Sequence, residues 1–159
     1  MGVKRIVDTE FWTDPDVIDK YACEDKYFML YLLTNPHTKQ CGIYSLPKKC
    51  IGFELGKSKE VVEVLIQRFE DDFQKIIYNT ATQEISILNS LKYSVVKGGT
   101  PVEDCIRKEL SEIKDKCLIE KTYNHLTEFW KNSNRPFDQN IKAIFEEAIK
   151  KESSKERTN

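Results

Sequence analysis

The sequence predicts a mainly α-helical protein with one small β-hairpin, in the α+β class. Apolar residues recur at three- and four-residue intervals through much of the chain, as they do on the buried faces of helices. Two β-rich runs, 75–79 and 84–89, flank a polar loop, which is the pattern of a hairpin. The chain has 159 residues, of which 40% are hydrophobic, enough for one domain, or one domain with an appendage, around a sizeable core.

Two helices are expected before residue 36. Asp14 is a good cap, and Pro15 suits the first turn of the short helix that follows. The apolar stripe of that helix consists of Val17, Ile18 and Tyr21. A second helix is expected at 24–34, before Asn35-Pro36, and its predicted buried residues are Tyr27, Phe28, Tyr31 and Leu32. Because its neighbours are apolar, Trp12 is also assigned to the core, as are Tyr27 and Tyr31, and not to stacking on single-stranded bases.

The segment "ELGKSKEVVEVLIQRF" (54–69) predicts a tight corner between two helices. Pro47 suits the first turn of the first helix, which follows a short β-type run at 42–46. This helix is expected to turn inward Cys50, Ile51 and Leu55. Gly56 supplies a left-handed C-cap, and Ser58 caps the second helix. The apolar face of the second helix consists of Val61, Val62, Leu65, Ile66 and Phe69.

The rest of the chain is predicted to be helical up to a polar tail. An amphipathic helix of about four turns is expected at 102–117, followed by a less regular stretch, and Asp138 is expected to cap a last helix. The tail lacks apolar residues and should be disordered. We therefore divide the chain into a domain with an N-terminal extension (1–92), a linker or loop (93–101), a C-terminal helical extension (102–150) and a disordered tail (151–159).

Composition excludes strongly basic nucleic-acid binders and membrane-spanning proteins. The formal net charge is −1, so any contact with DNA must come from a local patch of charge. No run approaches the roughly 20 apolar residues that span a bilayer, and the start lacks the apolar stretch of a signal peptide. We therefore expect a cytoplasmic protein without a membrane partner.

The residues that usually carry chemistry are sparse. The five cysteines form no C-x-x-C pair and are expected to be reduced thiols. His37, Cys41 and Cys50 do not complete a four-ligand zinc site, so no metal or other cofactor is expected. Neither His37 nor His125 lies in a Ser or Cys motif that would make it a catalytic base. The sequence therefore predicts a binding protein and not an enzyme.

Residues 24–89 combine these elements in the order helix, short strand, helix, tight corner, helix, two-stranded hairpin. This is the element order of a winged helix-turn-helix, here with additional C-terminal helices. In that fold the corner lets two helices cross steeply, so that the third helix enters a DNA major groove while the hairpin touches the neighbouring backbone. Ser58 would then aim a helix N-terminus toward phosphate.

The stretch from "GIYSLPKKCIGFELGKSKEVV" to "EISILNSLKY" (42–93) resembles the N-terminal domain of phage replisome-organiser (replication initiation) proteins. These are similar to the N-terminal domain of the DnaD-type primosome proteins of Gram-positive bacteria. Flanking segments that include "FWTDPDV" and "KGGTPVEDCIRKELSEIKDKCLIE" extend the resemblance to about residues 8–121. The resemblance implies recognition of duplex origin DNA and assembly of a primosome, with a helicase loader or another primosome protein as partner.

The resemblance also implies which residues contact DNA. Those expected to face the groove are Lys57, Ser58, Lys59, Glu63 and Gln67. Lys48 and Lys49 would contact phosphate from the start of the second helix. The wing tip would consist of Asn79, Thr80, Thr82 and Gln83.

The alternative is a protein-interaction and oligomerisation scaffold of a primosome, with the same fold and little DNA affinity. The neutral charge and the acidic residues on and after the third helix, Glu60, Glu63, Glu70, Asp71 and Asp72, favour this hypothesis. Related domains are oligomeric, so a homo-oligomer is expected. The expected dimer elements are the strand-like segment 3–11 and the helix at 102–117.

Overall fold

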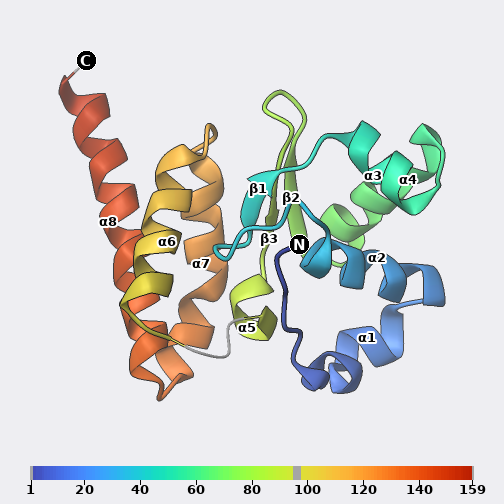
Figure 1. Cartoon of the computed structure of the whole chain (residues 1–159), viewed down its shortest axis with the longest axis horizontal. Helices are drawn as coiled ribbons and strands as arrows, with labels where there is room; N and C mark the ends of the chain where they lie inside the picture. Colours follow the sequence, from blue (N-terminus) through green and yellow to red (C-terminus); the bar gives the residue numbers. More distant parts are fainter. Residues whose placement is uncertain (1, 95–97, 159) are drawn as a thin grey trace.

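The computed structural model describes residues 2–94 and 98–158, and these confirm the α+β class. The elements, in chain order, are the 3-10 helix η1 (Thr9–Thr13), α1 (Pro15–Lys20), α2 (Cys23–Thr34), β1 (Ile43–Ser45), α3 (Lys48–Leu55), α4 (Lys59–Gln67), the π-helical turn η2 (Arg68–Asp72), β2 (Ile76–Asn79), β3 (Glu84–Ile87), α5 (Ser90–Ser94), α6 (Thr100–Glu112), α7 (Cys117–Asn132) and α8 (Pro136–Thr158). Figure 1 shows the sheet between two groups of helices, α1–α4 on one side and α6–α8 on the other.

The sheet is antiparallel and has the strand order β1-β3-β2. Successive side chains of a strand point to opposite faces, so helices on both faces require both sets to be buried. All four residues of the central strand β3 are buried. Ile85 packs in the core formed with α1–α4, whereas the hydroxyl of Ser86, on the other face, lies 2.5 Å from that of Thr122 on α7. On β1, Tyr44 belongs to the first core and Ile43 to the second.

The predicted corner between α3 and α4 is confirmed. Gly56 ends α3 in the left-handed conformation, with φ 66° and ψ 38°. The amide of Lys57 donates to the carbonyl of Gly52 at 2.9 Å, which closes the C-terminal turn of α3. Ser58 then begins α4, and its hydroxyl accepts from the Val61 amide at 3.3 Å. Cap chemistry therefore determines both sides of the corner.

Three residues assigned to the core are instead exposed: Trp12 (55%), Ile18 (59%) and Tyr27 (56%). Each lies directly beside a buried residue in the chain, namely Phe11, Val17 and Phe28. Consecutive residues of an α-helix are about 100° apart around the axis, so a narrow core-facing stripe admits one residue of such a pair and excludes the other.

The predicted strand-like segment at 3–11 is also wrong. Residues 2–8 form no strand, and η1 begins at Thr9. The segment is attached to the body through irregular contacts. The Arg5 guanidinium donates to the hydroxyl and the carbonyl of Thr38 at 2.9 and 2.8 Å, and the Asp8 amide donates to the carbonyl of Tyr93 at 2.8 Å.

The C-terminal helices differ from the prediction at the boundary between α6 and α7. The expected helix at 102–117 ends at Glu112, and the stretch expected to be less regular is the sixteen-residue helix α7. The cause is a distant residue, Glu84 of β3, which is 5% exposed. Its carboxylate accepts from the amides of Lys114 and Asp115, each at 2.9 Å. Those two amides therefore leave the helical pattern, and the chain turns there.

The end of the chain corrects two further predictions. Helix α8 begins at Pro136 and continues to Thr158, so the tail predicted to be disordered is helical over residues 151–158. It lacks glycine and proline and continues a packed helix, which favours propagation over a new helix start. Asp138 lies in the first turn and accepts from the Ser133 hydroxyl at 2.5 Å. Residue 159 lies outside the described residues.

The predicted linker at 93–101 is shorter than expected. Helix α5 ends at Ser94 and α6 begins at Thr100, while 95–97, which belong to the predicted linker, lie outside the described residues, as does residue 1 of the predicted first domain. The helices expected as an extension pack on the sheet, since their core includes Cys41, Ile43 and Leu91. Among the described residues, no helix combines the length and apolar character needed to cross a bilayer.

Candidate nucleic-acid interface

Helix α4 has one buried face and one exposed face. Val62, Leu65 and Ile66 are buried, as the apolar pattern predicts, and Phe69 in η2 continues the same face. Glu63 and Gln67 lie on the opposite, exposed face with the start of the helix. The sequence therefore correctly places these two residues at the surface, where a ligand can reach them.

The start of α4 carries the most accessible positive charge of the predicted site. Lys57, Ser58 and Lys59 are all exposed, and in the part of the chain that the structure describes neither lysine has an ion-pair partner. The amides of the first helical turn add the positive end of the helix dipole. Exposed Lys49 lies near the other end of α3, about 10 Å along the helix axis at 1.5 Å per residue.

The far end of α4 is acidic. Glu60 and Glu63 lie on the helix, and η2 adds Glu70, Asp71 and Asp72. Burial raises the pKa of Glu70, although its carboxylate also accepts from the backbone amide of Tyr78. A polyanion would therefore be attracted to the first turn of α4 and repelled toward its last turn.

Lys48 does not fit the predicted role as a free phosphate contact. Its side chain is half-buried, and its ammonium lies 5.4 Å from the centre of the Tyr78 ring, a cation–π arrangement. The lysine thereby joins the start of α3 to β2. The neighbouring Lys49 is exposed and keeps the predicted accessibility.

The hairpin loop is arranged differently from a free wing tip. Asn79 accepts from the amides of Ala81 and Thr82 at 2.8 and 3.1 Å, and its own amide group donates to Asp115 at 2.7 Å. Asn79 thus shapes the loop and attaches it to the α6–α7 turn. Gln83 is left-handed at φ 57°, and its carbonyl accepts from the Leu46 amide at 2.8 Å. The loop lies between the α3–α4 pair and the α6–α7 pair (Figure 1).

Of the four predicted wing-tip residues, Thr80 and Gln83 are exposed, whereas Asn79 and Thr82 are half-buried. The correction for Asn79 and Thr82 has a tertiary cause, because the loop leans on the C-terminal helices that were expected to form a separate extension. The hairpin therefore offers two accessible side chains and no cation at its tip.

Sequence reasoning missed two exposed apolar side chains on this unit. Phe53 of α3 is 89% exposed, and Val64 of α4 is 53% exposed. The signal was present for Phe53: Ile51 and Leu55 define the inward stripe, and a residue two positions from each lies about 200° away on a helix. An almost fully exposed phenylalanine is unusual for a surface that contacts only solvent.

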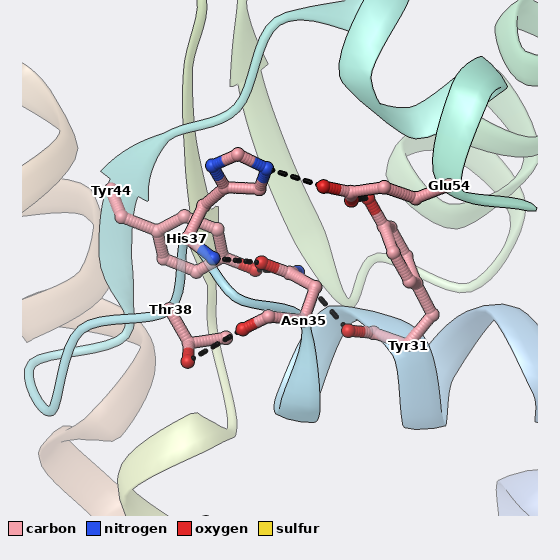
Figure 2. Close-up of polar contacts among 6 residues, drawn as sticks. All are labelled: Tyr31, Asn35, His37, Thr38, Tyr44 and Glu54. Carbon is pink, nitrogen blue, oxygen red and sulfur yellow. Dashed lines mark hydrogen bonds and ion pairs between the residues drawn. The ribbon is translucent and has the colours of Figure 1, made fainter. Parts of the chain in front are cut away.

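A second missed feature is a polar network that orients α3 against α2 (Figure 2). Glu54 of α3 accepts from the Tyr31 hydroxyl of α2, and its other oxygen lies 2.6 Å from Nε2 of His37. Burial, followed by the hydrogen bond to Glu54, raises the pKa of Tyr31. His37 also donates its backbone amide to Oδ1 of Asn35 at 2.9 Å. These bonds set the angle of the helix pair that presents Lys57 and Lys59.

The five cysteines are free thiols, and the described residues contain no cluster of His, Cys, Asp or Glu suited to hold a metal ion. The side chains that can meet a ligand are therefore cations, polar groups and two apolar residues around α3 and α4. Comparison of the chain with protein-family models, with curated proteins and with solved structures finds no match.

Proposed function

We propose that this chain is a winged helix-turn-helix protein that binds duplex DNA in replication initiation, with the start of α4 in the major groove. The observation that carries the proposal is the exposed corner at Gly56, where Lys57, Ser58 and Lys59 precede a helix whose opposite face is buried. A helix held in this way can enter a groove without losing its packing.

The order of elements supports the proposal. Helices α2, α3 and α4, strand β1 and the β2–β3 hairpin follow each other as in a winged helix-turn-helix, and β3 lies between β1 and β2. Each lysine that neutralises a phosphate releases a condensed counterion, so affinity should arise from Lys57, Lys59 and Lys49 despite the net charge of −1. The acidic end of α4 would remain outside the groove.

The assignment to replication initiation rests on the resemblance of residues 8–121 to phage replisome organisers. That resemblance implies origin DNA as the duplex, and a helicase loader or another primosome protein as the protein partner.

A second candidate function is a primosome scaffold that self-associates or contacts a partner protein. Phe53, 89% exposed, favours it, because burying a phenylalanine side chain contributes about 1.5–3 kcal/mol to association. The carboxylates that follow the start of α4 favour it as well.

Binding to a mixed-sequence duplex of about 30 base pairs, measured by fluorescence anisotropy at two salt concentrations, tests the DNA proposal. Lys57→Glu with Lys59→Glu should weaken binding at least tenfold and lower the log–log salt slope by about two phosphate contacts, at about 0.9 each. Lys150→Glu with Lys151→Glu on exposed α8 makes the same change of charge and should alter affinity less than threefold.

Two results would contradict DNA binding through α4: no salt-dependent binding by the unaltered chain, or equal losses in both double variants. The first result would leave the scaffold as the remaining candidate. Sedimentation in the analytical ultracentrifuge separates the two further, since Phe53→Ser should dissociate an oligomer formed through α3. A monomer at high micromolar concentration would exclude self-association.

A further inference from the structure

The two edges of the sheet are treated differently. Along the outer edge of β2, the Glu70 carboxylate accepts from the backbone amide of Tyr78, and the Lys75 amide donates to the carbonyl of Phe69 at 2.9 Å. Turn η2 therefore covers that edge. An uncovered edge strand presents a row of unpaired amides and carbonyls, which another extended chain can use.

Strand β1 is the other edge, and the register shows which of its groups point outward. The Leu46 amide donates to Gln83 and the Ile87 amide donates to Gly42, each at 2.8 Å. In an antiparallel ladder such bonds alternate, so Gly42, Tyr44 and Leu46 face β3, while Ile43 and Ser45 direct their backbone groups away from the sheet.

The outward groups of β1 are almost entirely unused. The carbonyl of Ile43 accepts only from the Cys41 thiol, at 3.3 Å. Within the described ranges, the Ile43 amide and both backbone groups of Ser45 have no hydrogen-bond partner, and the Ser45 side chain is exposed. Buried or half-buried backbone groups of this kind normally find a partner.

Two hollows adjoin this edge. The larger, about 770 Å³, lies between the N-terminal segment, the loop at 36–40, the start of α3 and α6. The smaller, about 160 Å³, lies along β1 between Thr82 of the hairpin loop and the end of α6 at Ile113. Lys39, Ser45 and Glu109 line both. The two hollows thus form one groove along the open edge.

Each hollow contains a side chain with an unsatisfied oxygen. In the described part of the chain, Oε1 of Gln40, in the larger hollow, and Oγ1 of Thr82, in the smaller, are buried and have no hydrogen-bond partner. Such groups carry a free-energy cost of about 1–3 kcal/mol each. Both are shielded in the unliganded chain, so a ligand would reach them after a side-chain rotation into the adjoining hollow.

We propose that the outer edge of β1 binds an extended peptide segment of a partner protein, which pairs with Ile43 and Ser45 as an additional strand. Backbone pairing of this kind supplies affinity through the main chain, while hollows on either side select side chains. The unpaired amides and carbonyls of β1 match a peptide backbone, which offers both donors and acceptors.

Charge and shape distinguish this occupant from the alternatives. The groove is lined by the cations Arg5, Lys39 and Lys114 and by the carboxylates of Glu84, Glu109 and Glu112, a balance that offers no net attraction to a phosphate backbone. A second folded copy would bring the same walls to its own β1, so two such recessed edges would meet wall to wall. A single extended chain fits between the walls.

Peptides selected from a phage-displayed library of random twelve-residue sequences, then synthesised, test this proposal on the full chain. Ser45→Pro removes the outward amide without removing a bond to β3, and proline is tolerated at sheet edges. Ser45→Ala keeps the amide and is the matched control. Selected peptides should bind the unaltered chain and Ser45→Ala equally, and Ser45→Pro at least tenfold more weakly.

Amide hydrogen exchange followed by NMR locates the binding independently of any variant. In the free chain the Ser45 amide should exchange faster than that of Tyr44, and bound peptide should slow it at least tenfold. The proposal is overturned if no peptide is enriched, if folded Ser45→Pro binds as well as the unaltered chain, or if protection appears elsewhere. Protection of Ser45 that rises with protein concentration alone would indicate self-pairing and would overturn it too. If Ser45→Pro does not fold, exchange in the unaltered chain decides.

Discussion

Replacing Glu84 with glutamine tests the contact that attaches the C-terminal helices to the sheet. The carboxylate is 5% exposed and accepts from the amides of Lys114 and Asp115, each at 2.9 Å. Glutamine keeps one acceptor oxygen in the same volume but turns an NH₂ group toward the second amide. One charge-assisted bond is lost, and one buried N–H is left facing a donor.

A hydrogen bond to a charged group contributes about 1.5–3 kcal/mol to stability, and burying a neutral amide is less costly than burying a carboxylate. We therefore expect Glu84→Gln to lower the free energy of unfolding by about 2 kcal/mol. Glu84→Ala, which loses both bonds, should cost about 3–4 kcal/mol by the same reasoning. At a urea slope of about 1.5 kcal/mol/M, the glutamine variant should unfold at a concentration about 1.3 M lower.

Urea denaturation followed by far-UV circular dichroism at 25 °C measures these changes. Glu112→Gln, an exposed carboxylate at the end of the same helix, is the control and should lie within about 0.5 kcal/mol of the unaltered chain. If Glu84→Gln unfolds at the same urea concentration as Glu112→Gln, the two bonds do not hold the α6–α7 turn, and the reasoning is refuted.

Two further predictions concern local features. An added Cβ at Gly56 would meet no atom within 4 Å, so Gly56→Ala should cost only the left-handed backbone strain, about 1 kcal/mol, and Gly56→Asn less; equal urea midpoints for all three chains would contradict the corner. The pKa of Asp16 is lowered by its hydrogen bonds to Lys75 at 2.7 Å and Lys20 at 3.1 Å, so its stabilising effect exists above the unfolded value of 3.8 and is lost as pH falls below it. Asp16→Asn, at a site one-third exposed, should therefore cost about 0.5–1 kcal/mol at pH 7 and progressively less below pH 4, and a cost independent of pH would contradict this assignment.

Much of the segment from α2 to β3 follows from local patterns. Gly56 and Ser58 act within one helical turn of themselves, and the face formed by Val62, Leu65 and Ile66 repeats at the helical period. The hairpin was recognisable because two β-rich runs are adjacent in the chain. Cap and period signals operate over about four residues, so a single sequence contains them in full.

The candidate site was predicted less completely than the fold. Lys49, Lys57, Ser58 and Lys59 are exposed as expected. Lys48, by contrast, lies over the Tyr78 ring, thirty positions away in the chain. Accessibility of a long side chain depends on which surface passes beside it, and no local pattern contains that information.

The sequence by itself determined the α+β class, the caps around Gly56 and the hairpin, because each depends on residues close together in the chain. Tertiary structure alone decided that α6–α8 cover the second face of the sheet, that α6 stops at Glu112 and that Asn79 is bonded to Asp115. Those outcomes depend on contacts between residues about thirty or more positions apart, such as Glu84 with Lys114. Contacts at that distance form only when the whole chain has folded, and their energies then override the preferences of the local sequence.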